Sequence, residues 1–324
     1  MSEKPKGGAT LLVASAGGHL QELWEMLPRL SATQSLDVTW VTYDTAQSRS
    51  LLTGADVVFA PYANPRQLSM VARHLGLANR MLKGGRFARV ISTGSSIALG
   101  FIPRARAGGL SCHYIESSAR VDGPSLTGRI LTWVPGTHMY SQVEGWREPP
   151  WHYRGSVFDD YRTEKVLGEP KPVHRIVVAV GSQQAYGFTS LLRRLTDIVP
   201  PTAEVLWQTG STDVSNLGIS ARPDIPTEEL AHEMAMADVV VIHAGVGLAL
   251  LALSTGHCPV VVPRRSALGE HVDDHQVQLA TALASKGLAV TSEAGQLSLE
   301  HLRQASSLRV ERVADPPPFD LIPD

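Results

Sequence analysis

Glycine-containing loops recur four times along the chain, each after an apolar run and before a stretch with helical periodicity. Glycine lets backbone N–H groups approach an anion closely, and the start of a helix favours negative charge. One such loop is weak evidence, because a tight turn from strand to helix needs glycine in any case. Four of them favour a ligand that carries phosphate. The loops occupy residues 15–19, 92–96, 181–184 and 243–247.

His19 ends the first of these loops and is the best candidate for a catalytic base. A neutral imidazole can take a proton from a hydroxyl near pH 7, which few other side chains can do. A lone histidine at a loop end is more often structural, but the glycine loop at a strand end favours catalysis. Glu116 also follows a strand, and it either contacts a substrate or supports a helix start or an ion pair.

Motifs for common cofactors are missing from the sequence. Gly245 and Gly247 are followed by Leu250 where a dinucleotide-binding loop has its third glycine, and no Gly-Lys-Ser/Thr loop occurs. Dehydrogenases and nucleoside triphosphatases are therefore disfavoured. His271 and His275 stand one helical turn apart, which could suit a metal, but the motif offers no third ligand. We predict no metal and no cofactor.

Short β-branched or apolar runs alternate with longer helical patterns, as in a parallel sheet covered on both faces. The alternation stops at a polar stretch with two prolines and then restarts. We therefore predict an α/β fold with two Rossmann-like domains facing a central cleft, where open sheets bind ligands. The expected parts are a first domain at 1–158, a linker at 159–172, a second domain at 173–314 and a flexible tail at 315–324. The expected strands are 10–14, 38–42, 57–60, 90–92, 112–115, 175–180, 204–207, 238–242 and 259–262.

Composition excludes some classes of protein. The 324-residue chain has a formal charge of -2 and 43% hydrophobic residues, which suits two globular domains and gives no electrostatic case for nucleic acid. Cys112 and Cys258 lie in separate apolar stretches, so we expect reduced thiols and a cytoplasmic protein. We find neither a signal peptide nor a run of about 18 apolar residues, so we expect any membrane contact to be peripheral.

Residues 65–89 combine cations with apolar side chains and include no acidic residue. Such a basic amphipathic segment could lie on an anionic membrane surface, on the inner face of the membrane. It could equally form a helix that packs on a sheet and exposes a solvated cationic face. The cations are Arg66, Arg73, Arg80, Lys83, Arg86 and Arg89.

Five motifs of the second half occur in an order and spacing that are specific to one enzyme family. They are 180–183 (VGSQ), 207–210 (WQTG), 237–245 (ADVVVIHAG), 256–263 (GHCPVVVP) and 273–276 (DDHQ). With these motifs the second half resembles the donor domain of GT-B glycosyltransferases. Within that fold it is similar to the peptidoglycan lipid-intermediate N-acetylglucosaminyltransferase and to the catalytic subunit of the dolichol-diphosphate N-acetylglucosamine transferase.

The first half resembles a different subunit. Residues 15–19 (SAGGH), 114–117 (YIES) and 125–129 (SLTGR) resemble the membrane-associated partner of the dolichol enzyme. They also resemble the corresponding half of bacterial exopolysaccharide transferases. The chain therefore looks like the two subunits fused, with the resemblance covering nearly all of it except the linker and the tail. This implies an acceptor in the first domain and a nucleotide-sugar donor in the second.

The resemblance implies roles for individual residues. His19 would be the general base, with Gly17, Gly18, Gly94, Ser95 and Glu116 on the acceptor side. His243 and the turn at 245–247 would present a cation or donor and helix N–H groups to the leaving phosphates. Residues 274–276 would hold sugar hydroxyls. The full donor set is Gly181, Ser182, Gln183, Gln208, Thr209, Gly210, His243, Gly245, Val246, Gly247, Asp274, His275 and Gln276.

Two leucines depart from the family pattern. Leu251 stands where relatives place an acidic residue that grips the ribose hydroxyls, and Leu248 replaces a polar residue near the phosphate. With these two leucines, the sequence does not specify the nucleotide base of the donor. Arg264 and Arg265 either form a solvated pair at a strand end or attract an anionic donor.

The combined reading is an inverting glycosyltransferase. It would move a sugar from a UDP-sugar to a hydroxyl of a lipid-linked saccharide in the synthesis of cell-surface polysaccharide or glycoconjugate. A nucleotide-sugar epimerase of the same architecture is the first alternative. A non-catalytic protein that binds sugar nucleotides is the second, with Leu248 and Leu251 in its favour.

Overall fold

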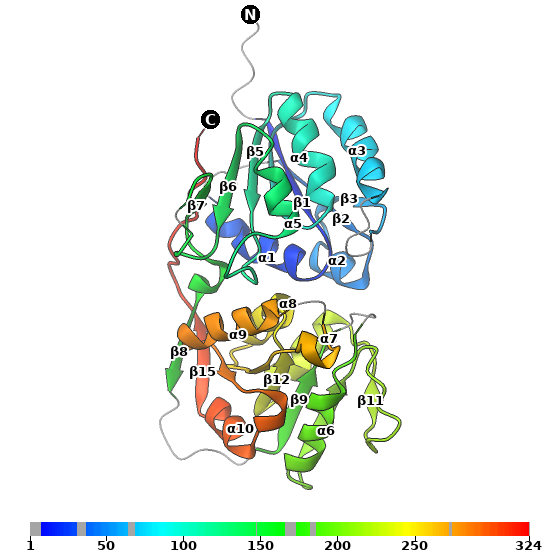
Figure 1. Ribbon diagram of the computed structural model, residues 1–324, viewed down its shortest axis with the longest axis vertical. Coiled ribbons are helices and arrows are strands. Elements are labelled where there is room, and N and C mark those ends of the chain that lie inside the picture. The colour runs from blue at the N-terminus through cyan, green and yellow to red at the C-terminus, as the bar shows by residue number, and fades with distance from the viewer. Residues whose placement is uncertain are drawn as a thin grey trace, which may run out of the picture. The chain divides into compact units, whose positions relative to one another are not determined.

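The computed structural model describes residues 8–30, 37–63, 69–146, 148–165, 173–181, 186–271 and 274–323. The chain divides into two compact units (Figure 1). Unit 1 comprises Met1–Val157 and Pro316–Asp324, and unit 2 comprises Phe158–Asp315. Each unit contains one parallel sheet with its own helices.

The sheet of unit 1 has the strand order β3-β2-β1-β4-β5-β6-β7, and all its pairings are parallel. The order reverses between β1 and β4, so the loops that follow these two strands emerge side by side. The strands are β1 Ala9–Ala14, β2 Val38–Tyr43, β3 Asp56–Ala60, β4 Phe87–Gly94, β5 Ser111–Ile115, β6 Thr137–Ser141 and β7 Trp151–Tyr153.

Every residue of β1 is buried, so helices cover both faces of this sheet. Leu11 and Val13 of β1 share a core cluster with Ile97 and Phe101 of α4. Leu12 alternates to the opposite face and is also fully buried. The helices of unit 1 are α1 Gly18–Met26, the 3-10 turn η1 Leu27–Arg29, α2 Ala46–Leu51, α3 Ser69–Leu82, α4 Ile97–Ala107 and α5 Leu126–Leu131.

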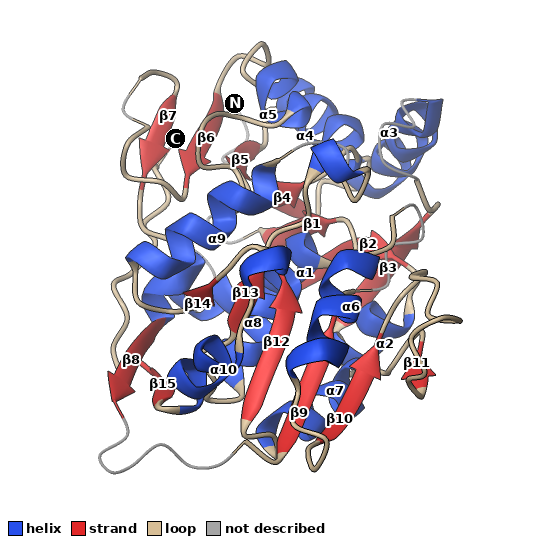
Figure 2. Ribbon diagram, turned by 60° about the horizontal axis from the view of Figure 1, so that its bottom comes forward, coloured by secondary structure: helices blue, strands red, loops and turns tan. Residues whose placement is uncertain are grey.

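The sheet of unit 2 has the order β11-β10-β9-β12-β13-β14 and is also parallel. Figure 2 shows β10, β9 and β12 side by side. Its strands are β9 Arg175–Ala179, β10 Glu204–Gln208, β11 Ala221–Arg222, β12 Val239–His243, β13 Val260–Val262 and β14 Val290–Thr291. Its helices are α6 Thr189–Ile198, α7 Thr227–Ala235, α8 Val246–Ser254, α9 His275–Ser285 and α10 Leu299–Ser306, with 3-10 turns η2 Val157–Asp160, η3 Ser266–Leu268 and η4 Ala294–Gln296.

Two connections differ from the sequence-based expectation. The stretch predicted as a linker begins with η2 and then strand β8 Tyr161–Lys165, which pairs antiparallel with β15 Leu308–Arg312. The pairing joins residues more than 140 positions apart, so no local sequence pattern predicts it. Residues 166–172 of the predicted linker lie outside the described part of the chain.

The prediction of a flexible tail is wrong for residues 316–323, which pack on unit 1. Phe319 is fully buried, and its ring lies 5.6 Å from that of Tyr140. The backbone N–H of Phe319 donates to the carbonyl of Arg29, and that of Ile322 donates to the Tyr140 hydroxyl. A proline-rich tail has no periodicity, but one aromatic side chain with a hydrophobic place to bury is enough to order it.

The predicted strands of both sheets are confirmed, with ends that shift by at most three residues. Within the described ranges, none of the helices is long and apolar enough to cross a membrane.

Candidate active site

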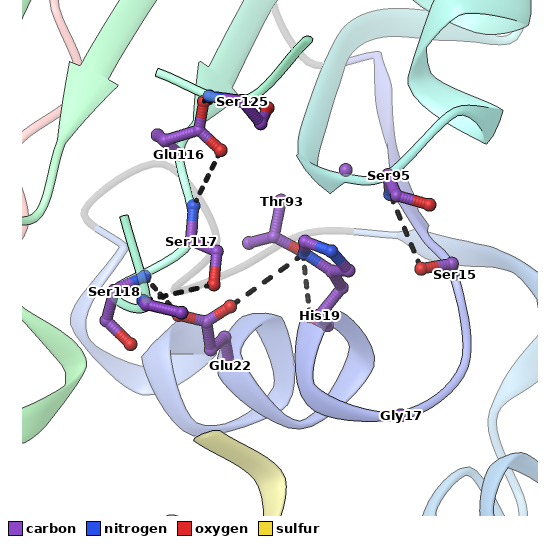
Figure 3. Close-up of polar contacts among 12 residues, drawn as sticks. Ser15, Gly17, His19, Glu22, Thr93, Ser95, Glu116, Ser117, Ser118 and Ser125 are labelled. Carbon is purple, nitrogen blue, oxygen red and sulfur yellow. Dashed lines mark hydrogen bonds and ion pairs between the residues drawn. The ribbon is translucent and has the colours of Figure 1, made fainter. Parts of the chain in front are cut away.

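The loops after β1 and β4 meet in unit 1 (Figure 3). Ala14 and Gly94 are register partners, and the N–H of Ser15 donates to the carbonyl of Gly94 over 2.8 Å. The N–H of Ser95 donates to the Ser15 hydroxyl over 3.4 Å. The structure thus brings together the predicted acceptor-side loops, which lie about 80 residues apart in the sequence.

His19 stands in the first turn of α1, next to this meeting point. Its carbonyl accepts a 2.7 Å hydrogen bond from the Thr93 hydroxyl, which anchors the backbone to β4. Gly94 has a φ of 103°, and a Cβ there would lie 3.4 Å from the imidazole Cε1, so the ring rests against the glycine. The His19 side chain keeps 28% of its surface exposed. An imidazole that is fixed in place yet accessible suits a general base.

Glu22, one turn along α1, lies behind the imidazole and is completely buried. Its Oε1 accepts hydrogen bonds from the Ser118 N–H at 2.6 Å and from Gln142 Nε2 at 3.1 Å. Its Oε2 lies 3.9 Å from His19 Nδ1. Burial raises the pKa of Glu22 to about 7, against the lowering effect of the bonds from Ser118. Glu22 was not among the site residues predicted from the sequence, although its position three residues after a histidine in a helix was a usable signal.

Glu116 is buried beneath the loop that follows β5. Its Oε2 accepts from the N–H and the hydroxyl of Ser125, each at 2.9 Å. Its Oε1 accepts from the Tyr114 hydroxyl and from the N–H of Ser117, each at 3.2 Å. Ser125 in turn caps α5 through the N–H of Gly128. Of the two roles open for Glu116, these contacts favour support of a helix start. Burial raises the pKa of Glu116, and the hydrogen bonds from Ser125 oppose this shift.

The first glycine loop is held by a glutamine from another element. The Gly17 N–H donates to Gln47 Oε1 over 2.6 Å, and Gln47 Nε2 donates back to the Gly17 carbonyl over 3.3 Å. Gly17 has a φ of 90°, a conformation that favours glycine. Gly18 follows as the first residue of α1. The loop conformation is therefore set by α2 as well as by its own glycines.

In unit 2 a glutamine side chain also holds the backbone of a loop glycine. The Gly181 N–H donates to Gln208 Oε1 over 2.9 Å, and Gln208 Nε2 donates to the carbonyls of Gly181 and Pro223 at 3.1 and 2.8 Å. Gln208 was predicted to touch the donor, but these bonds occupy its amide and it is only 3% exposed. Thr209 is also buried, and the N–H groups of Thr209 and Gly210 bond to backbone carbonyls of the β11 region. The predicted Ser182 and Gln183 lie outside the described residues.

His243 ends β12 with its imidazole between two glycines. A Cβ at Gly181 would lie 2.9 Å from its Cε1, and one at Gly245 would lie 2.3 Å from its Nε2. Both positions therefore need glycine. Burial, and then the nearby charge of Arg264, lowers the pKa of His243 to about 3. The imidazole is thus neutral at physiological pH, which disfavours the cation and leaves the hydrogen-bond donor of the two predicted roles.

Helix α8 begins at Val246, directly after the Gly245 N-cap, which as a glycine has no side chain to cap the first N–H groups. A helix start of this kind stabilises an anion. Gly247, the second residue of the helix, has no side chain that could cover the helix start. Leu248 and Leu251 lie on the same helix, and Leu251 is 9% exposed. Helix α8 therefore carries no carboxylate.

The Asp274–Gln276 motif divides between surface and core. Asp274 Oδ1 accepts from the N–H and the hydroxyl of Ser266 at 2.9 and 3.0 Å. Gln276 is 3% exposed, and its Oε1 accepts from the Arg264 N–H at 3.0 Å. The His275 ring lies edge-on to that of His271, with 4.7 Å between centroids.

Arg264 is a residue whose role the sequence left open. It is 1% exposed and donates to the carbonyls of Val180 at 2.8 Å and Tyr186 at 2.9 Å. These two carbonyls flank the Gly181 loop, so the guanidinium ties its ends together. Burial lowers the pKa of Arg264 to about 10, and it stays charged at neutral pH. Arg265 instead pairs with Glu293 near the surface.

No group of three His, Cys, Asp or Glu side chains that could hold a metal ion occurs in the part of the chain that the structure describes.

The two Rossmann-like units define a class of fold. The chain resembles the crystal structure of Acinetobacter baumannii MurG with a TM-score of 0.58 and 20% identity, over 91% of this chain and 89% of that one. It has the GT-B fold. Residues 175–305, most of unit 2, match the family described as the glycosyltransferase family 28 C-terminal domain.

A curated relative from Chlorobium phaeobacteroides (strain DSM 266 / SMG 266 / 2430) is 28% identical over 155 residues. It is a UDP-N-acetylglucosamine--N-acetylmuramyl-(pentapeptide) pyrophosphoryl-undecaprenol N-acetylglucosamine transferase. The match covers 46% of this chain and 42% of the relative, less than half of either. The fold alone does not separate enzyme classes, since a UDP-N-acetylglucosamine 2-epimerase also resembles the chain, with a TM-score of 0.54, 12% identity and 93% and 94% coverage.

Proposed function

We propose that the protein is an inverting, nucleotide-sugar-dependent glycosyltransferase that acts on a lipid-linked saccharide. The observation that carries this proposal is the accessible, backbone-anchored imidazole of His19 at the β1/β4 switch point. It is joined in one chain to a unit that matches a glycosyltransferase domain. The relative's printed substrates, a UDP-sugar and a lipid-linked acceptor, support the same substrate classes here.

In the proposed reaction, His19 removes the proton from an acceptor hydroxyl. That oxygen bonds to the anomeric carbon while the bond to the donor diphosphate breaks, and the electron pair leaves with the nucleoside diphosphate. The start of α8 at Val246 stabilises the charge that develops on the phosphates. His243 is neutral and contributes shape and hydrogen bonding, and Arg264 supplies fixed positive charge behind the loop.

The remaining predicted site residues divide by their contacts. Gln208 and Gln276 bond to backbone groups of the loops, so we propose that they position the donor site from behind. We propose the same supporting role for Glu116 on the acceptor side. Asp274 and His275 are less deeply buried and remain the candidates for direct contact with the sugar.

The epimerase alternative shares the fold, but the domain family and the curated relative are both transferases. The non-catalytic alternative rests on Leu248 and Leu251, which leave α8 without a carboxylate for the ribose. A ribose can be held by backbone groups, so the leucines bear on affinity for the nucleotide more than on the proton transfer at His19.

A panel of UDP-sugars, assayed with and without extracted lipid acceptor, separates the three functions. A transferase releases UDP and labels the lipid only when the acceptor is present. An epimerase converts the sugar nucleotide without any acceptor. A binding protein shows a thermal shift with UDP-sugar and no turnover, and this outcome would refute the proposal.

We also propose that unit 1 rests peripherally on an anionic membrane, at the cytoplasmic side, through α3. The apolar residues Leu77 and Leu82 of α3 lie in the core, so only part of the predicted amphipathic face is free for lipid. Arg73, Arg80 and the half-exposed Leu75 lie on the outer face of the helix. Of the segment's other predicted cations, Arg66 lies outside the described residues.

Sedimentation with anionic vesicles at low salt tests this surface. The double change Arg73→Gln and Arg80→Gln should weaken binding roughly 30-fold, at about 1 kcal/mol per cation. Arg86→Gln is the matched control from the same segment, because Arg86 already pairs with Asp37 and Asp56. Equal losses in both variants, or no sedimentation of the wild type, would contradict membrane contact through α3.

A further inference from the structure

Glu22 is a buried acid that the proposed reaction has not yet used. It has no exposed surface, and its two carboxylate oxygens have different surroundings. Oε1 accepts the bonds from Ser118 and Gln142, while Oε2 faces His19 Nδ1 at 3.9 Å (Figure 3). Burying a carboxyl in the core lowers the stability of the fold, so we expect a carboxyl kept there to have a role other than stability.

We infer that Glu22 is a positioning residue for His19, which holds the imidazole with its proton on Nδ1 and stabilises the imidazolium formed during glycosyl transfer. This inference rests on the proposed function of His19. The separation of 3.9 Å is an ion-pair distance, and such contacts commonly shorten when substrate binds. The arrangement has the logic of the buried aspartate that orients the histidine of a catalytic triad.

The proton inventory is simple. With Nδ1 protonated and directed at Glu22, the lone pair of Nε2 accepts the proton of the acceptor hydroxyl. The ring then carries one positive charge, which the Glu22 carboxylate offsets across Nδ1. Glu22 gives up no proton and receives none, and after the transfer the imidazolium returns its proton to solvent.

Several ionisable groups surround this pair. Glu116 and Tyr114 come from β5 and its following loop. Burial raises the pKa of Tyr114, and the negative charges of Glu116 and Glu22 add to this shift. Arg120, in the same loop, favours ionisation of Glu116. Glu25, one turn further along α1, bonds to Gln21. Because Glu22 has a raised pKa of about 7, the carboxylate that the inference requires is fully formed only above neutral pH.

The first test needs no substrate, and a variant serves only to assign the signal. In the full-length protein with ¹⁵N-labelled histidine, the imidazole nitrogen shifts at a pH above 8 report which nitrogen of His19 holds the proton, with His19→Asn identifying the signal. We expect the Nδ1–H form. The Nε2–H form at His19 would overturn the inference, whatever the enzyme turns over.

The second test is Glu22→Gln. Ser118 and Gln142 both donate to the site of Oε1, so the new amide oxygen should take that place and turn its NH2 group toward His19. The amide would then donate to Nδ1 and force the wrong tautomer, with Nε2 protonated. We expect kcat to fall about 10- to 100-fold with KM changed less than about threefold. The low-pH limb of the kcat profile should move about one pH unit lower, because the imidazole loses an adjacent negative charge.

Controls separate this inference from the proposed function. Glu25→Gln removes a buried carboxyl from the same helix, away from the imidazole, and should leave the tautomer and the pH profile unchanged. Glu22→Asp keeps the charge and should recover part of the lost turnover. If His19→Ala abolishes transfer but Glu22→Gln keeps both kcat within twofold and the wild-type pH profile, His19 is the base and the inference about Glu22 is wrong. If no UDP-sugar is turned over by any form, the tautomer still decides whether Glu22 orients the ring.

Discussion

His19 follows β1 in unit 1 and His243 ends β12 in unit 2. Both imidazoles lie against glycines at the carboxyl ends of parallel strands, yet the nearby charged groups have opposite sign. His19 rests on Gly94 beside the buried acid Glu22. His243 is packed between Gly181 and Gly245, and burial, followed by the nearby charge of Arg264, lowers its pKa to about 3. His19 can gain a proton because the carboxylate of Glu22 offsets the new charge, whereas a proton on His243 would add positive charge beside the cation Arg264.

The loops around the two imidazoles are held in the same way. Gln47 holds Gly17 and Gln208 holds Gly181 in the same way: the glutamine Oε1 accepts from the glycine N–H, and the glutamine Nε2 donates to the glycine carbonyl. The two units therefore share a loop scaffold and differ in the side chains behind it. Under the proposed function, this difference would assign proton transfer to unit 1 and phosphate binding to unit 2.

The largest effect should come from His19→Ala. Loss of a general base costs about 100- to 10,000-fold in turnover, while donor binding and Tm should stay nearly unchanged because the side chain is partly exposed. Steady-state kinetics with saturating UDP-sugar and lipid acceptor measure the loss. A variant that keeps more than about a third of wild-type turnover would show that the proton goes elsewhere.

The two units should respond to pH in opposite directions. The folded pKa of Glu22, about 7, lies above its ordinary 4.5, so unit 1 loses stability as pH rises from about 4.5 to 7. Glu22→Gln should therefore stabilise unit 1 at pH 8 by about 3 kcal/mol and have little effect below pH 4.5. The folded pKa of His243, about 3, lies below its ordinary 6.5, so unit 2 loses stability as pH falls below 6.5.

Hydrogen exchange resolved by peptide measures each unit separately. Peptides of β1 and β4 report on unit 1, and peptides of β9 and β12 report on unit 2. If both units lose protection in the same pH range, the contrast between the two buried groups does not control stability.

The paired glutamines offer a matched comparison. Gln208→Ala should lower the stability of unit 2 by about 2 kcal/mol, because Gln208 is buried and its loss leaves backbone groups at Gly181 unsatisfied. Gln47→Ala should cost about 1 kcal/mol or less, since Gln47 is only half-buried and water can replace it. Denaturant unfolding followed by the fluorescence of Trp207 for unit 2 and of the remaining tryptophans for unit 1 gives both values. A larger loss from Gln47→Ala would reverse the comparison.

The smallest expected effect concerns α8, which lacks the acid that α1 carries. Leu251→Glu introduces a carboxylate where the family pattern has one, and we expect a few-fold gain in UDP affinity, equivalent to about 1 kcal/mol, if unit 2 keeps that geometry. Isothermal titration with UDP measures it, and Leu253→Glu, at a core position of the same helix, controls for a general effect of charge. Unchanged or weaker UDP binding would place the ribose elsewhere.

The sequence by itself determined the repeated α/β pattern, the glycine loops and the position of His19 directly after a strand and its glycine loop, which made it the candidate base. Such features are local: a strand reads as an apolar run, and a loop that must approach a ligand or a ring needs glycine. For the same reason the short strands β6, β7, β8 and β15 escaped prediction, because their polar or brief sequences become strands only through partners far along the chain.

Only the tertiary structure decided which polar side chains act behind the loops. Gln208 and Gln276 read as ligand contacts, but packing buries them against the backbone of Gly181 and Arg264. Glu22 looks like one helical carboxylate among others until Ser118 and Gln142, about 100 residues away, close over it. A side chain's charge state depends on its burial and neighbours, and neither is a local property of the chain.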